Sequence, residues 1–134
     1  MATTTKSKAT KKKNTDRRVE SVRFAVTSTF NNTIVTASDL ATGQVLDWTS
    51  SGRAGFKGTK KGTPYAATSA TKTLIDTVMN SYKPEIFYVD VSGAGNGRDA
   101  ALRAIAAAGI KIAKIQDTTR LPHNGCRAKK ARRA

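Results

Sequence analysis

Apolar and polar positions in the first half of the chain alternate with the period of a β-strand. Val22, Phe24 and Val26 alternate with polar or small neighbours, which predicts a strand with one buried face. A polar break follows, and residues 33–38 and 44–49 have the β-branched and apolar composition of two further strands. The short polar connections between these segments predict an antiparallel meander.

In the second half of the chain the period changes to that of a helix. Thr63 can cap a helix whose first position is Pro64, where a missing N–H costs nothing, and apolar residues follow at helical spacing until Lys83-Pro84 ends the pattern. The remaining elements are a strand, an alanine-rich helix and a last strand, over residues 86–91, about 98–108 and 110–115. The first of these is almost continuously apolar, which is typical of a strand covered on both faces.

The element order β-β-β-α-β-α-β predicts an α/β fold. Right-handed crossovers place the fourth and fifth strands parallel to the first. The expected sheet is therefore mixed, with the strand order 3-2-1-4-5 and the second strand antiparallel. We expect this α/β core to span residues 19–119, between a basic N-terminal extension over 1–18 and a basic C-terminal tail over 120–134.

Positive charge is concentrated at the two ends. The chain has 24 Lys and Arg against 9 Asp and Glu, a formal net charge of +15. Residues 1–18 hold seven of the basic residues and one acid, and residues 120–134 hold six basic residues and no acid. Because these ends have little apolar surface to bury, we expect them to be disordered alone and to order on a polyanion. Solubilising tails are the alternative interpretation.

Composition also excludes several classes of protein. A length of 134 residues suits one soluble domain, and no stretch approaches the ~20 apolar residues of a membrane helix or the core of a signal peptide. One cysteine, Cys126, excludes an intramolecular disulfide. Together with the one histidine, His123, it supplies too few ligands for a metal centre and no rigid catalytic pair. We therefore expect no catalytic residues, metal, cofactor, small-molecule substrate or membrane partner.

A loop over residues 51–62 places glycines and cations around one aromatic ring, directly before a helix start. Glycine allows the backbone to approach a phosphate closely, cations neutralise it, and Phe56 can stack on a base. The pattern predicts a nucleic-acid contact, with a flexible linker as the alternative. For Phe56 alone, packing in the core is as good an interpretation as stacking.

A second glycine-rich segment, residues 93–97, stands between a strand and a helix. That context is typical of a dinucleotide fingerprint, with Asp117 at the position of its acidic partner. The spacing is G-x-G-x-G, however, and Arg98 stands where the third glycine belongs. Presentation of N–H groups and Arg98 to a nucleic-acid phosphate, or a purely structural turn, are the other interpretations. In the tail, Asn124-Gly125 favours a tight turn.

Five motifs in order carry a family resemblance. They are Thr29 to Thr36, Gly52 to Lys61, Thr63 to Ala67, Gly97-Arg98-Asp99, and Pro122 to Arg127. Over roughly residues 19–134 the chain resembles the family of small-subunit ribosomal protein eleven, in its bacterial type. The resemblance implies a ribonuclease-H-like α/β core without nuclease activity, on the platform of the small subunit. There it would bind and bridge helices of the small-subunit ribosomal RNA, beside the cleft where messenger RNA pairs with the end of that RNA.

The resemblance also implies partners and contact residues. The partners are small-subunit ribosomal proteins seven and eighteen and the third bacterial initiation factor. The residues expected to contact RNA are Asn31, Asn32, Arg53, Gly55, Phe56, Lys57, Gly58, Lys60, Lys61, Gly95, Asn96, Gly97, Arg98, Arg120, His123, Asn124, Gly125, Arg127, Lys129, Lys130, Arg132 and Arg133. The family usually has proline at Ala94, Arg120 and Ala128, so this tail lacks two pre-set φ angles.

The sequence thus predicts a non-enzymatic ribosomal RNA-binding protein that supports translation in the cytoplasm of a bacterium, with a plastid as the alternative. Two other classes stay open at this stage. One is an architectural DNA-binding protein, which the same basic ends would serve, and the other is a nucleotide-dependent enzyme that uses residues 93–98.

Overall fold

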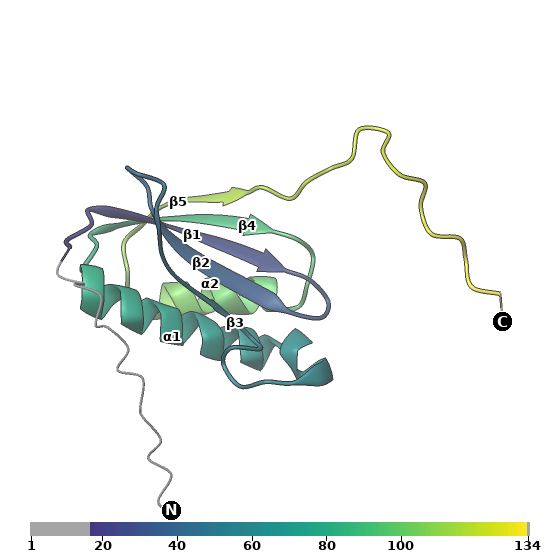
Figure 1. Ribbon diagram of the computed structural model, residues 1–134, viewed down its shortest axis with the longest axis horizontal. Coiled ribbons are helices and arrows are strands. Elements are labelled where there is room, and N and C mark those ends of the chain that lie inside the picture. Colours follow the sequence, from purple (N-terminus) through teal and green to yellow (C-terminus); the bar gives the residue numbers. More distant parts are fainter. Residues whose placement is uncertain (1–16, 134) are drawn as a thin grey trace, which may run out of the picture.

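Five strands form one mixed sheet, and two helices cover one of its faces (Figure 1). The computed structural model describes residues 17–133, so most of the predicted N-terminal extension lies outside the described residues. The strands are β1 (Ser21–Ser28), β2 (Thr33–Asp39), β3 (Val45–Ser50), β4 (Ile86–Ser92) and β5 (Ile112–Asp117). The helices are α1 (Pro64–Tyr82) and α2 (Gly97–Ala107), with a short 3₁₀ helix, η1 (Gly58–Gly62), before α1.

The predicted strand order is confirmed. The sheet runs β3-β2-β1-β4-β5, with β2 antiparallel to both β1 and β3, and with β4 parallel to both β1 and β5. Two parallel crossovers, one through α1 and one through α2, bring the chain from β3 to β4 and from β4 to β5. Both helices lie on the same side of the sheet in Figure 1.

The core lies between the sheet and the helices. Phe24 of β1 and Phe87 of β4 are almost completely buried, and their rings stack with centroids 5.4 Å apart. Val26 sits in register with Val35 on one side and Val91 on the other, and all three are buried. Each such side chain contributes about 1.5–3 kcal/mol when it is removed from water.

The prediction that the fourth strand is covered on both faces is wrong. In β4 the buried residues Phe87, Val89 and Val91 alternate with half-buried neighbours, because no helix among residues 17–133 covers the second face. On that face Asp90 pairs with Arg23 at 3.3 Å. The run looked continuously apolar because Tyr88, which tolerates partial exposure, lies between the core residues.

The ends of α1 follow local sequence signals, as predicted. The Thr63 hydroxyl accepts a hydrogen bond from the backbone N–H of Ala66 at 3.4 Å, Pro64 takes the first helical position, and Lys83 ends the helix with φ +46° before Pro84. The last strand begins and ends two residues later than expected, and η1 was not expected at all. Neither helix combines the length and apolarity needed to cross a membrane within residues 17–133.

Candidate nucleic-acid interface

Four predicted contact segments meet at one edge of the sheet. Strands β1, β3, β4 and β5 all run in the same direction, so their carboxyl ends share this edge. The β1–β2 connection (29–32), the glycine-rich loop after β3 (51–62), the loop after β4 (93–96) and the tail after β5 all leave from it. Residues that are far apart in the sequence are brought together in this way.

The glycines hold the β1–β2 connection between two loops. A Cβ on Gly95 would lie 2.2 Å from the Thr29 carbonyl oxygen, and a Cβ on Gly62 would lie 2.3 Å from the Phe30 carbonyl oxygen. The backbone N–H of Gly95 donates to the Ser28 carbonyl at 3.2 Å. Only glycine allows backbones to approach so closely. The hairpin tip therefore packs between the loop after β4 and the end of η1, and we call it the clamped hairpin tip.

The same contacts account for the glycine-rich segment 93–97. A Cβ on Gly93 would meet the Ser28 carbonyl oxygen at 2.0 Å, and a Cβ on Gly97 would meet the Thr33 hydroxyl at the same distance. These glycines face the interior of the protein, so packing explains them without a bound pyrophosphate. Among the interpretations left open by the sequence, the geometry favours a structural turn.

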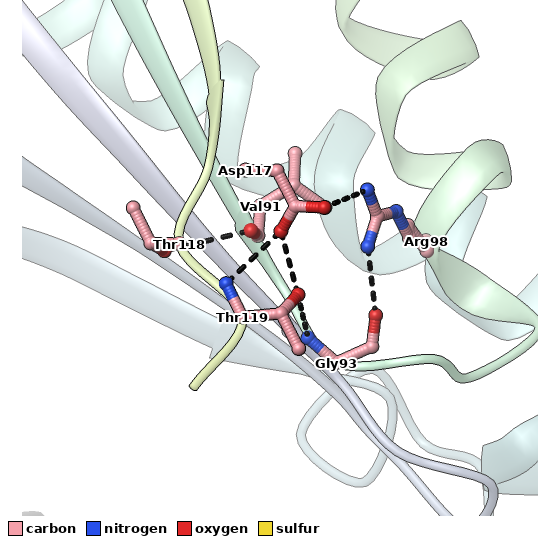
Figure 2. Close-up of polar contacts among 6 residues, drawn as sticks. All are labelled: Val91, Gly93, Arg98, Asp117, Thr118 and Thr119. Carbon is pink, nitrogen blue, oxygen red and sulfur yellow. Dashed lines mark hydrogen bonds and ion pairs between the residues drawn. The ribbon is translucent and has the colours of Figure 1, made fainter. Parts of the chain in front are cut away.

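Arg98, predicted to meet a phosphate, instead forms hydrogen bonds with other residues of the protein (Figure 2). Its guanidinium donates to the Gly93 carbonyl and to the Asp117 carboxylate, both at 3.0 Å. Asp117 also accepts hydrogen bonds from the hydroxyl and the backbone N–H of Thr119. These two bonds, and then Arg98, hold the pKa of the Asp117 carboxyl well below its usual range.

Arg53 is also partnered. Its guanidinium lies over the Trp48 ring, 4.8 Å from the centroid, donates to the Trp48 carbonyl and pairs with Asp47 at 3.4 Å. Lys57, Lys60 and Lys61 are different, since they form no ion pair with any residue in 17–133. Lys57 and Lys60 are exposed and Lys61 is half-buried. The lysines are thus the cations of this loop that have no ion pair within the described residues, and we call them the uncommitted lysines.

The remaining residues of the two loops have simple explanations. Gly55 and Gly58 adopt positive φ values of +102° and +60°, which favour glycine at turns. Asn96 is exposed at the start of α2. Phe56 is half-buried and meets Tyr65 edge to face, with centroids 5.8 Å apart, so it packs against a neighbour rather than standing free.

At the hairpin tip the two asparagines differ. The Asn32 side-chain oxygen accepts from the Thr33 backbone N–H at 2.9 Å, and its carbonyl accepts from the Thr29 N–H, so Asn32 shapes the turn. Asn31 is exposed. Next to it Phe30 is 74% exposed, on a tip that the glycine contacts hold in place. Sequence reasoning missed Phe30, although an aromatic residue in a polar turn was a usable signal.

Arg103 is a second residue that sequence reasoning missed. With Pro64, Asn96 and Arg98 it lines an open groove of about 510 Å³ between the starts of α1 and α2. Arg103 is exposed and has no ion pair within the described residues. The only signal in the sequence was a second arginine, after Arg98, within an alanine-rich helix.

The tail runs outward from the edge of the sheet (Figure 1). Residues 118–133 form no helix or strand and are exposed. Asn124 has φ +56°, where the chain bends as its Asn-Gly sequence suggested. The predicted contact residues in this segment are all exposed: Arg120, His123, Asn124, Gly125, Arg127, Lys129, Lys130, Arg132 and Arg133. In residues 17–133 no cluster of three or more His, Cys, Asp or Glu side chains is arranged to hold a metal.

Comparison with known proteins gives consistent results. The family model described as Ribosomal protein S11 matches residues 23–133. The small ribosomal subunit protein uS11c of Mesostigma viride is 48% identical over 119 residues, covering 89% of this chain and 90% of that protein. The small ribosomal subunit protein uS11 of Acaryochloris marina is 52% identical over 108 residues, covering 81% of this chain and 82% of that protein. The uS11c protein of Pinus thunbergii is 50% identical over 108 residues, with the same coverage.

Proposed function

Because this chain belongs to the ribosomal protein S11 family, we propose that it binds small-subunit ribosomal RNA with the sheet edge described above. Membership of the family makes it a structural protein of the small ribosomal subunit, with a part in translation. RNA is the natural polyanion for such a protein. The clamped hairpin tip, the lysines of the 51–62 loop, Arg103 and the tail would form one continuous contact surface.

The observation that carries this proposal is which cations along the edge form an ion pair within the described residues and which do not. Arg53 and Arg98 pair with Asp47 and Asp117, while the lysines of the loop and the six cations of the tail have no acidic partner within residues 17–133. Unpaired cations gain most when they replace the counterions of a phosphate backbone. The hairpin and loops would set the position of the protein, and the cations without an ion pair would supply most of the affinity.

We further propose that the protein lies on the platform of the small subunit and bridges several RNA helices there, beside the cleft for messenger RNA. Small-subunit ribosomal proteins seven and eighteen and the third bacterial initiation factor are its proposed neighbours. This placement rests on the family resemblance. We propose a bacterial ribosome in the cytoplasm, and the uS11c relatives support a plastid ribosome as the alternative.

The test is a comparison of polyanions at equal salt concentration. The full chain is titrated against folded small-subunit ribosomal RNA and against duplex DNA of equal length, and each affinity is measured over a range of salt. If about eight cations engage phosphates, log affinity should fall against log salt with a slope of roughly −6 to −7. We expect tighter binding to the folded RNA.

Two other outcomes would assign the protein differently. Equal affinity for the RNA and for duplex DNA would favour an architectural DNA-binding protein. Measurable affinity for NAD or ATP would favour a nucleotide-dependent enzyme. Co-sedimentation with small ribosomal subunits, reversed only by strong salt, provides an independent check of the proposed function.

A further inference from the structure

We propose that Asp117 and Thr119 form a latch that fixes the direction in which the basic tail leaves the core, and that this latch strengthens RNA binding. The two residues act through the tail, as positioning residues, and do not themselves contact RNA. The inference rests on the proposed function and extends it to residues that no charge-based argument would select.

The latch joins the end of β5 to the end of β4 and the start of α2 (Figure 2). The Thr119 hydroxyl donates to the Asp117 carboxylate at 2.6 Å and accepts from the Gly93 N–H at 3.3 Å. The other carboxylate oxygen accepts from Arg98 at 3.0 Å, and Arg98 in turn donates to the Gly93 carbonyl. Between them, the Thr118 backbone N–H donates to the Val91 carbonyl at 2.8 Å.

Beyond Thr119 the tail forms no further hydrogen bond or ion pair within the described part of the chain. Residues 120–133 are exposed, and none of them takes part in a hydrogen bond or ion pair with residues 17–133. The latch is therefore the last hydrogen-bonded point between the core and the tail, two residues before Leu121, which lines an open pocket with Gly93 and Arg98. Fixing that point reduces the conformational entropy that the tail loses on binding, which is the general benefit of preorganisation.

The position of Asp117 is otherwise unexpected. A carboxylate at an edge that meets phosphates repels them, so electrostatics alone would favour its removal. Its contacts instead stabilise the charged form and lower the pKa of the carboxyl group, so the carboxylate stays ionised to a lower pH than an ordinary aspartate. A carboxylate that accepts hydrogen bonds from Arg98 and Thr119 at this edge is explained if it holds the tail.

The latch and simple electrostatics predict opposite signs for the same substitution. Asp117→Asn removes a negative charge next to the RNA, so electrostatics predicts tighter binding. The latch predicts weaker binding, by about threefold to tenfold, the range expected for lost hydrogen bonds of ordinary strength. Asp99→Asn is the matched control, because Asp99 is an exposed acid in the first turn of α2, one residue from Arg98. For that control, binding should be unchanged or slightly tighter.

A substitution without charge change separates the two effects further. Thr119→Val keeps the shape of the side chain and removes the hydroxyl that connects Asp117 with Gly93. We expect it to weaken RNA binding by a similar factor, and we expect Thr119→Ser, which retains the hydroxyl, to restore affinity. Both variants are measured in the full chain with folded small-subunit ribosomal RNA.

Two readouts show that the effect passes through the tail. In a full-length chain whose six tail cations are replaced by glutamine, Thr119→Val should have no effect on the remaining affinity. Cys126 is the only cysteine of the chain and is exposed in the tail, so a cleavage reagent can be attached there alone. The wild-type tail should cut the RNA at a few neighbouring nucleotides, and the Thr119→Val tail should cut more weakly over a wider range.

The outcomes separate this inference from the proposed function. If the wild type binds the RNA but Asp117→Asn and Thr119→Val bind equally well or better, the latch is refuted and the proposed function stands. An equal loss in the chain with the neutral tail would also refute it, since the residues would then act on the core. If the wild type does not bind the RNA at all, both proposals fail.

Discussion

Gly97, the first residue of α2, shows how little space single atoms have at the sheet edge where the candidate contact segments meet. A Cβ there would lie 2.0 Å from the Thr33 hydroxyl and 2.8 Å from the Ala67 Cβ. For Gly97→Ala we expect the cost of overpacking to lie at the upper end of the usual ~1–3 kcal/mol. It exceeds the gain of up to ~1 kcal/mol that alanine has over glycine in a helix. The free energy of unfolding, measured in urea, should fall by about 2 kcal/mol.

Gly52→Ala is the matched control for this prediction. Its Cβ would meet the flexible Lys61 side chain at 3.5 Å and the Ser50 hydroxyl at 3.8 Å, both ordinary contact distances, so stability should change little. Equal stability of the Gly97→Ala protein and the wild type would mean that the hairpin and α2 are not in close contact.

Phe30 should separate RNA affinity from stability. Its side chain is 74% exposed, so Phe30→Ala should leave the free energy of unfolding within about 0.5 kcal/mol of the wild type. If the ring stacks on an unpaired base, RNA affinity should fall by the equivalent of about 1–3 kcal/mol. Phe30→Trp should keep the affinity, and Phe30→Leu, which has apolar bulk but no flat ring, should not. Wild-type RNA affinity in Phe30→Ala would argue against stacking at this position.

The sequence predicts which residues carry charge, but it does not predict which of these charges form ion pairs within the protein. Arg53 and Lys60 look equivalent in the glycine-rich loop, yet Arg53 is bound by Asp47 and the Trp48 carbonyl, while Lys60 is exposed without an ion pair among residues 17–133. The difference depends on the path of the loop after β3. That path is set by tertiary contacts, which no local pattern encodes.

At the scale of elements, signals that act within a few residues were sufficient for the ends of α1 but not for β4 and β5. The ends of α1 were predicted because Thr63, Pro64 and the Lys83-Pro84 pair act on the adjacent backbone. The displaced β5 had no such signal, since its register is set by pairing with β4 and by an irregularity between Phe87 and Tyr88. The partial exposure of the second face of β4 was missed for the same reason, because burial depends on what packs there.

The η1 segment is where the uncommitted lysines of the loop can be tested as a unit. Replacing Lys60 and Lys61 with alanine removes two cations that have no ion pair within residues 17–133. If both meet phosphates, the salt dependence of RNA binding should flatten by about 1.4 to 1.8 units of slope. The control replaces Lys72 and Lys111, which are exposed on α1 and before β5, away from the loop. An unchanged slope in the Lys60 and Lys61 variant would show that this loop does not touch phosphate.

On the scale of the whole molecule, the fold brings to one edge of the sheet candidate contact residues that the sequence spreads from Asn31 to Arg133. The strand order could be predicted because crossover handedness leaves few topologies for this element order. The convergence of the hairpin with both glycine-rich loops could not, because it depends on three backbones that approach within contact distance. The basic tail was evident from composition alone, whereas its attachment through Asp117 and Thr119 required the structure.

The last prediction concerns the division between a folded core and a basic tail, which we propose lies near residue 120. Deleting residues 120–134 should leave the melting temperature unchanged, because residues 120–133 are exposed and bond to nothing else among residues 17–133. RNA affinity should fall by orders of magnitude, and the salt slope should flatten by about 4 to 5 units, if all six cations meet phosphates. A neutral glutamine-substituted tail of equal length separates charge from chain length and should behave as the deletion does. Unchanged RNA affinity after the deletion would show that the tail is not part of the interface, and the edge would then have to bind RNA through the hairpin and loops alone.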